Sequence, residues 1–284
     1  MHIALLNCGL KALAMRTAAV LAALFFTSAQ AQLKNGDNPE ASPNWQKVKA
    51  SLFKGRSIAA APAGMLELDI PQRAADAAVV PVAMRTHLAA GDNRFVKRLT
   101  LVIDSNPSVV AAVFDFAPGN GNAEIETRVR IDEYTHVRAI AELSDGRLFM
   151  STRYIKASGG CSAPAGKDPA EALSNLGKMR LRVDGEWHPG QPMLAQLMIN
   201  HPNHSGMAMD QLTRQFTPAY FVRQVTVSYA GKPVMSAELD FSISENPNLR
   251  FRFVPRGPGE LKVEALDSQD RRFESVLVLA PTAS

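Results

Sequence analysis

A single cysteine in a loop of small residues is the part of this sequence best suited to covalent chemistry. Cys161 stands in the segment 156–167, which reads Lys-Ala-Ser-Gly-Gly-Cys-Ser-Ala-Pro-Ala-Gly-Lys and holds no large apolar residue. Such a segment has little surface to bury, so we expect it to be mobile and exposed. The residues expected to give this loop its flexibility are Ser158, Gly159, Gly160 and Ser162.

The surroundings of Cys161 favour a carrier over a catalytic nucleophile. The thiolate is the reactive form of cysteine, and only Lys156 and Lys167 stand near Cys161 in the sequence to stabilise it. The sequence around Cys161 shows no Cys–His–Asp or Cys–His–Asn arrangement. An accessible, weakly activated thiol can hold a group covalently while other proteins act on that group. The alternative is a buried cysteine that packs as a small apolar residue.

The first 31 residues predict an export signal. Lys11 and Arg16 precede the apolar run 18–26, and Ala29-Gln30-Ala31 forms a small-x-small cleavage site. Cleavage near Ala31 would remove Cys8 and leave Cys161 as the lone cysteine of a periplasmic protein, unable to form an internal disulfide. The apolar run is shorter than the ~20 residues that a membrane span requires.

Composition excludes other broad classes. The chain has 284 residues, of which 46% are hydrophobic and 20% are charged, so it can fold around a core. The 31 basic and 27 acidic residues give a net charge of +4, and without residues 1–31 there are 29 basic and 27 acidic residues. No clustered basic face is evident, so a nucleic-acid partner is not expected.

Alternating apolar residues predict an all-β protein with two immunoglobulin-like antiparallel sandwiches in tandem. A tail and short helix occupy 32–64, with the helix opening at Ser42-Pro43 and placing Trp45, Val48 and Leu52 on one face. The remaining parts are a first sandwich at 65–155, the cysteine loop and a linker helix at 156–178, and a second sandwich at 179–284. The expected strands are 66–70, 79–85, 97–103, 109–116, 124–130, 136–142 and 147–155, then 179–183, 194–200, 221–229, 234–241, 249–254, 260–266 and 273–279.

The two halves of the chain contain a similar order of turns and expected strands. An Asn-Pro turn at 106–107 precedes the strand 109–116, and a second Asn-Pro turn at 246–247 precedes the strand 249–254. An alternating strand follows in each case, at 124–130 and at 260–266. Because proline fixes its own φ and pushes the residue before it to an extended conformation, this repeated turn predicts two sandwiches of related topology.

Two histidines and several arginines carry weaker expectations. His201 and His204 are three residues apart and could contribute to a metal site, although Pro202 argues against a helical ligand pair and favours a structural role. Nothing in the sequence calls for a cofactor. A basic strand face is the interpretation for four arginines, which a solvated sheet face explains equally well: Arg128, Arg130, Arg138 and Arg153.

Four segments resemble the periplasmic sulfur-oxidation (Sox) carrier. Ala-Ser-Gly-Gly-Cys at 157–161 resembles the Gly-Gly-Cys-Gly-Gly arm of its cysteine-bearing Y subunit. The runs at 201–206 and 217–221 resemble the His-Pro-x-x-(Ser/Thr)-Gly and Pro-Ala-(His/Tyr)-Phe motifs of the partner Z subunit, and the segment 243–250 resembles a later strand pair of that subunit. In this order, over about residues 40–280, the chain is similar to fused SoxYZ-type carriers that occur with quinoprotein (PQQ) alcohol dehydrogenases.

The resemblance implies a function. It implies that Cys161 holds a thiosulfate- or sulfide-derived group, as a thiosulfonate or persulfide, and that the protein has no active site of its own. The implied partners are periplasmic sulfur-oxidation enzymes or cytochromes and a PQQ-dependent dehydrogenase system. One departure is that Ser162-Ala163-Pro164 replaces the trailing glycines, so the arm is anchored at both ends. A non-covalent binding or adaptor module and a His-based metal-binding protein stay as alternatives.

Overall fold

The computed structural model describes residues 38–89, 91–164, 166, 173–210 and 213–280. The expected export signal and most of the expected linker helix lie outside these residues. Pro43–Ser284 forms one compact unit, and the 3-10 helix η1 (Pro39–Ala41) belongs to a separate unit. No helix in the described part of the chain is long and apolar enough to span a membrane.

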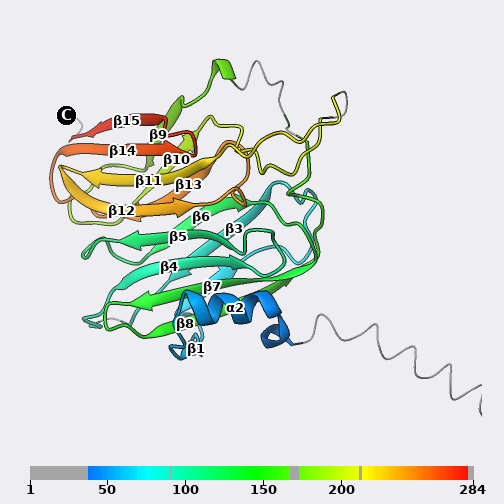
Figure 1. The fold of residues 1–284 in the computed structure, drawn as a ribbon. Helices are drawn as coiled ribbons and strands as arrows, with labels where there is room; N and C mark the ends of the chain where they lie inside the picture. The colour runs from blue at the N-terminus through cyan, green and yellow to red at the C-terminus, as the bar shows by residue number, and fades with distance from the viewer. Residues whose placement is uncertain (1–37, 90, 165, 167–172, 211–212, 281–284) are drawn as a thin grey trace, which may run out of the picture. The chain divides into compact units, whose positions relative to one another are not determined.

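The larger unit is built almost entirely from strands (Figure 1). Its elements are α2 (Pro43–Ser51), β1 (Ile58–Ala60), β2 (Leu66–Asp69), β3 (Val80–Thr86), β4 (Val96–Ile103), β5 (Val110–Phe116), β6 (Glu124–Val129), β7 (Thr135–Leu143), β8 (Leu148–Ile155), β9 (Met179–Asp184), β10 (Met193–Ile199), β11 (Val222–Tyr229), β12 (Lys232–Leu239), β13 (Asn248–Phe253), β14 (Gly259–Asp267) and β15 (Arg272–Leu279). Each of the fourteen expected strands is present, and only β1 was not expected.

The strands form two sheets that run through both halves of the chain. The nine-stranded sheet has the order β1-β8-β7-β4-β5-β12-β11-β14-β15, and the six-stranded sheet has the order β2-β3-β6-β13-β10-β9. The halves meet where β5 pairs with β12 and β6 pairs with β13, both antiparallel. We call this double junction the seam. Two immunoglobulin-like sandwiches in tandem therefore share both of their sheets.

The expected relation between the halves is confirmed in topology but wrong in its alignment. The order β8-β7-β4-β5 on one side of the seam matches β15-β14-β11-β12 on the other, and β2-β3-β6 matches β9-β10-β13. The Asn-Pro turn at 106–107 joins β4 to β5 within one sheet, whereas the turn at 246–247 joins β12 to β13 across the two sheets. The two turns are therefore not equivalent, and their likeness reflects the common use of Asn-Pro to reverse a chain.

The core lies between the two sheets and continues across the seam. Inward side chains alternate along the strands, as in β6, where Ile125, Thr127 and Val129 are buried while Glu126 and Arg128 on the outer face are only half-buried. One connected apolar cluster contains residues from β2 through β14. Burial of this cluster is what holds the two halves together, since the hydrophobic gain scales with the apolar area removed from water.

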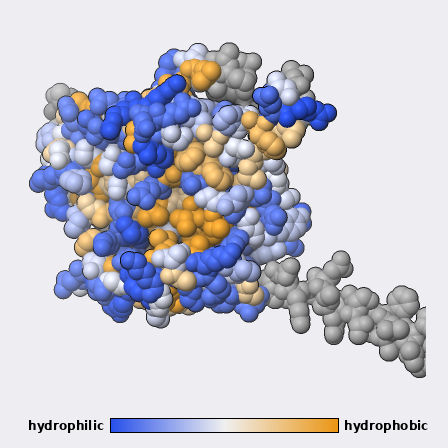
Figure 2. Space-filling model, in the orientation of Figure 1, coloured by the Kyte–Doolittle hydropathy of each residue, from blue (hydrophilic) through white to orange (hydrophobic). Residues whose placement is uncertain are grey.

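A second, smaller apolar cluster lies on the outer face of the nine-stranded sheet. Trp45 and Val48 of α2 pack there against residues of β4, β7 and β8, whereas Leu52 is exposed, against expectation. The Trp45 ring also covers Arg138, whose guanidinium forms a buried ion pair with Asp104 at 2.6 Å. Hydrophobic residues also gather on this face over the region of β5 and β12 (Figure 2).

The expected basic strand face does not form. Arg138 is buried on β7, and Arg153 is exposed on β8 of the same nine-stranded sheet. Arg128 belongs to β6 of the other sheet, and Arg130 follows that strand and is buried. The four arginines are thus divided between two sheets, a division that alternation within single strands could not reveal.

Candidate functional site

The cysteine loop leaves β8 and turns inward beside the seam. Ala157, Gly160 and Cys161 are buried, whereas Ser158, Gly159 and Ser162 are exposed. The Cys161 side chain has no solvent exposure and forms no disulfide. The expectation of an exposed sulfur on a free loop is therefore wrong for this structure.

Close backbone packing holds Gly160 in place. Its N–H donates to the Ile131 carbonyl at 2.9 Å, and the Gly159 N–H donates to the Asp132 carbonyl at 2.8 Å. A Cβ atom at position 160 would lie 2.1 Å from the Ala77 carbonyl oxygen, far inside contact distance. Only glycine fits there, so this residue lets the loop approach the backbone of the first half rather than freeing it from the surface.

The second half of the chain holds the cysteine from the other side. The Ser205 hydroxyl donates to the Cys161 carbonyl, and the Ser205 Oγ accepts from the Met207 N–H at 3.2 Å. Beyond the cysteine, the Gly166 N–H donates to the Glu245 carboxylate at 3.1 Å. Contacts to both sides of the seam therefore fix the segment around Cys161.

The electrostatic environment makes Cys161 a poor nucleophile in this closed position. Burial raises the pKa of its thiol from 9.0 to about 12, because the thiolate would lose its hydration. Burial is the largest cause of this rise in pKa; the negative charges of Asp132 and Asp240 contribute to it, and the positive charge of Arg130 opposes it. At neutral pH the sulfur is held as an unreactive thiol.

Arg130 is a buried cation that interacts electrostatically with Cys161. Its guanidinium donates to the backbone carbonyls of Phe241 at 3.0 Å and Ile243 at 2.6 Å, which belong to the connection after β12. Burial lowers its pKa, while Cys161 and Glu245 act in the opposite direction. Arg130 therefore joins the end of β6 to the second half and places a positive charge beside the cysteine.

A buried asparagine completes the hydrogen bonds at this end of the seam. The Asn106 side chain donates to the Arg130 carbonyl at 2.8 Å and to Ser242 Oγ at 3.0 Å, and it accepts from the Asp132 N–H at 3.0 Å. Asn106 thus satisfies backbone groups of the same strand end that anchors the cysteine loop.

The two candidate metal-ligating histidines have different environments. Buried His201 accepts from the Asn203 N–H through Nδ1 at 3.1 Å, and its Nε2 lies 3.6 Å from Asp267 Oδ2. His204 is half-buried, and its carbonyl accepts from the Tyr220 N–H at 3.0 Å. Among the residues that the structure describes, no group of three His, Cys, Asp or Glu side chains could hold a metal ion.

His201 predicts a pH dependence of stability. Burial lowers its pKa from 6.5 to about 4, so between these values the unfolded chain binds a proton that the folded protein does not. The contribution of neutral His201 to the free energy of unfolding is therefore fully present above about pH 6.5. It decreases as the pH drops toward 4, by about 3 kcal/mol at most. Urea unfolding at several pH values, compared with His201→Asn, measures the effect. Equal pH slopes in the two proteins would contradict it.

Sequence reasoning missed three residues that define the site: Asn106, Arg130 and Ser205. Two of them stand in motifs that were noticed, since Asn106 belongs to the first Asn-Pro turn and Ser205 to the segment 201–206. Arg130 was assigned to a basic strand face. Ser205 contacts Cys161 directly and Asn106 joins Arg130 to Ser242, and both arrangements depend on the seam, which brings residues far apart in sequence together.

Two family models match this chain in succession. The model for sulfur oxidation protein SoxY matches residues 49–161, and the model for sulphur oxidation protein SoxZ matches residues 181–277. Together they cover more than half of the 284 residues, and the SoxY match ends at Cys161.

Comparison with solved structures gives distant similarities. The chain is similar to the sulfur carrier protein SoxY from Chlorobium limicola f thiosulfatophilum, with 21% identity, a TM-score of 0.35 and coverage of 40% of this chain and 91% of that one. It is also similar to a superoxide reductase (neelaredoxin) from Ignicoccus hospitalis, with 11% identity, a TM-score of 0.29 and coverage of 39% and 90%. At these TM-scores neither likeness bears on function. No curated protein matches the chain.

The fold and the site together define a class of two-sheet β-proteins with a cysteine held where two similar halves meet. The chain belongs to the sulfur-oxidation proteins of the fused SoxYZ type, with the SoxY part before the SoxZ part.

Proposed function

We propose that this protein is a periplasmic carrier that holds a thiosulfate- or sulfide-derived group covalently on Cys161 while partner enzymes process it. The observation that carries the proposal is the position of the cysteine. Cys161 ends the SoxY-matched region, directly follows Gly159 and Gly160, and is the only cysteine among the described residues.

The chemistry of loading requires a partner. Joining the Cys161 sulfur to thiosulfate forms an S–S bond and releases the thiol proton and two electrons. A periplasmic cytochrome or another sulfur-oxidation enzyme would accept those electrons, and a PQQ-dependent dehydrogenase system is the further partner that we propose. The export signal expected at residues 1–31 supports the periplasmic assignment.

The buried sulfur adds a condition to this proposal. Cys161 has no exposure in the closed position, so loading requires the segment 159–162 to leave the seam. Among the described residues, three hydrogen bonds anchor that segment to the rest of the protein: two from the backbone N–H groups of the glycines and one from the Ser205 hydroxyl. A hydrogen bond contributes about 1 kcal/mol net, so a docking partner can supply enough free energy to open the loop. The closed position would protect the thiol from unspecific oxidation between cycles.

Intact-mass measurement tests the proposal. The mature protein, isolated from the periplasm of cells oxidising thiosulfate, should carry a sulfur-containing adduct that a reductant removes. Cys161→Ser, purified in the same way, should show the mass of the unmodified chain before and after reduction. An unmodified wild-type mass in every sample would contradict the carrier function.

The burial of Cys161 favours one other candidate, a non-covalent binding or adaptor module associated with a periplasmic quinoprotein dehydrogenase. In that case the cysteine is a packing residue. Cys161→Ser would then support sulfur oxidation or dehydrogenase activity in cells as well as the wild type does. A carrier with the same substitution would lose sulfur oxidation altogether.

A further inference from the structure

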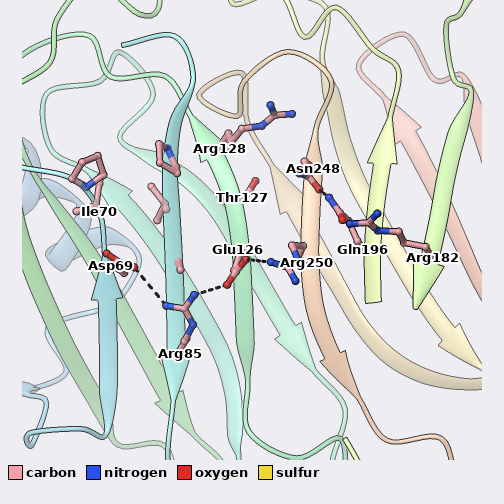
Figure 3. A pocket seen from close by; sticks show the side chains of 14 residues that line it. Asp69, Ile70, Arg85, Glu126, Thr127, Arg128, Arg182, Gln196, Asn248 and Arg250 are labelled. Carbon is pink, nitrogen blue, oxygen red and sulfur yellow. Dashed lines mark hydrogen bonds and ion pairs between the residues drawn. The ribbon is translucent and has the colours of Figure 1, made fainter. Parts of the chain in front are cut away.

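A groove of about 550 Å³ crosses the outer face of the six-stranded sheet at the seam (Figure 3). Its lining comes from both halves: the end of β2, the strands β3 and β6 from the first half, and β13, β10 and β9 from the second. The groove therefore exists only because β6 and β13 pair side by side. Neither the proposed carrier chemistry nor Cys161 makes use of it.

Arginine is the most frequent charged residue in the lining of this groove. Four arginines line it, Arg85, Arg128, Arg182 and Arg250, against the two carboxylates of Asp69 and Glu126. Glu126 pairs with Arg85 and also with Arg250 at 2.8 Å. Two carboxylates outside the lining add further pairs, Glu124 with Arg85 at 3.2 Å and Asp184 with Arg250 at 3.3 Å, so the charges of Arg85 and Arg250 are compensated.

The cation without a carboxylate partner is Arg128. Its guanidinium donates to the Asn246 carbonyl at 3.2 Å, and no ion pair neutralises it among the described residues. Arg182 lies 3.7 Å from the nearest carboxylate oxygen, on Asp184, and its side chain is 60% exposed. Arg128 is thus the one arginine of the lining for which the described residues provide no carboxylate partner.

Buried donors without partners concentrate in the same groove. Across the described residues, seven buried side-chain nitrogen or oxygen atoms lack a hydrogen-bond partner, and these include Nε of Arg128 and Nε of Arg250. Leaving such a donor unpaired is energetically unfavourable, so buried donors in proteins normally have water or a ligand as a partner. Gln196 Oε1 is an unpaired acceptor in the groove, and we expect a water molecule to accompany the ligand there.

We propose that this groove binds a small sulfate-type oxoanion non-covalently. Planar guanidinium groups match the oxygen spacing of such anions and form charge-assisted hydrogen bonds with them. The guanidinium of Arg128, which has no carboxylate partner among the described residues, favours an anion over a cation, and the charged, hydrogen-bonding lining disfavours an apolar ligand. Free sulfate and the terminal sulfonate of thiosulfate present the same three-oxygen face, so both belong to the proposed ligand class.

Isothermal titration of the mature protein with sodium sulfate tests this site. In chloride buffer at constant ionic strength we expect saturable binding with a dissociation constant on the order of 1 mM. Arg128→Gln should weaken binding about tenfold or more, because it removes a charged hydrogen-bond donor. Arg153→Gln is the matched control, since Arg153 is an exposed arginine on the other sheet that also donates only to a backbone carbonyl. Its binding should equal that of the wild type.

Four further measurements make the outcome decisive. Thermal unfolding of Arg128→Gln shows whether that variant is folded, and Arg128→Lys, which keeps the charge, should bind between wild type and Arg128→Gln. Cys161→Ser should bind sulfate as the wild type does, so the failure of covalent loading would leave this inference intact. Titration with thiosulfate in the same Cys161→Ser variant separates the two sources of the anion. No saturable binding of either anion, or equal binding by folded Arg128→Gln, would overturn the proposal.

Discussion

Cys161 of the native protein should react with 5,5′-dithiobis(2-nitrobenzoate) at pH 8 at roughly a thousandth of the rate of the urea-unfolded chain. The reason is the pKa of its thiol, which burial raises from 9.0 to about 12. A rise of three pKa units lowers the thiolate fraction about a thousandfold, and the thiolate is the species that attacks the reagent. The absorbance of the released thiolate measures both rates in the mature protein.

Two controls accompany this measurement. Cys161→Ser in the mature protein should release no colour, because Cys161 is its sole thiol once residues 1–31 are removed. Labelling in intermediate urea concentrations reports whether reaction follows opening of the loop or global unfolding. A native rate equal to that of the unfolded chain would show that the closed position is not the one populated in solution.

Gly160→Ala should release the cysteine. The added Cβ would lie 2.1 Å from the Ala77 carbonyl oxygen and 2.8 Å from the Ile131 carbonyl oxygen, and both of these are backbone atoms that cannot turn aside. The loop is the part that can move. We therefore expect it to leave the seam and the labelling rate of Cys161 to rise by up to about a thousandfold, toward that of the unfolded chain.

Gly159→Ala provides the matched control for this substitution. Gly159 has a φ of +80°, which alanine disfavours by about 1–2 kcal/mol, but a Cβ atom there would meet nothing within 4 Å. It should therefore change labelling far less than Gly160→Ala does. Equal labelling of the two variants would mean that backbone flexibility, not steric exclusion at position 160, decides whether the sulfur is accessible. Thermal unfolding should confirm that both variants stay folded.

The fold followed closely from local patterns in the sequence. Alternation of apolar residues located fourteen strands, because each strand buries one face against a single core. The strand β1 was missed because Ile58–Ala60 is too short to show a period. The alignment of the two halves was wrong because two similar Asn-Pro turns occupy different places in the topology, and a turn motif carries no information about which sheet its strands enter.

The cysteine loop shows the limit of reasoning from side chains alone. Small residues were taken to mean that nothing could order the segment. In the structure the absence of a side chain at Gly160 is what allows close approach to Ala77, and backbone hydrogen bonds to Ile131 and Asp132 supply the order. Such contacts depend on which segments the fold brings together, and this chain gives no local sign of them.

The groove lay beyond sequence analysis for a related reason. Glu126 and Arg128 alternate with the buried residues of β6, so a local pattern is enough to place them on its outer side. It could not show that Arg250 lies opposite Glu126, because that register is set by pairing between strands more than a hundred residues apart.

The seam also bears on how this chain behaves when diluted or divided. Separate proteins made from the two halves would each present naked strand edges, on β5 and β6 in one and on β12 and β13 in the other. Unpaired edges of that kind invite aggregation. Covalent fusion turns their association into a folding step within one molecule, governed by a fixed effective concentration. The two halves should therefore stay associated at low protein concentrations at which two separate subunits would dissociate.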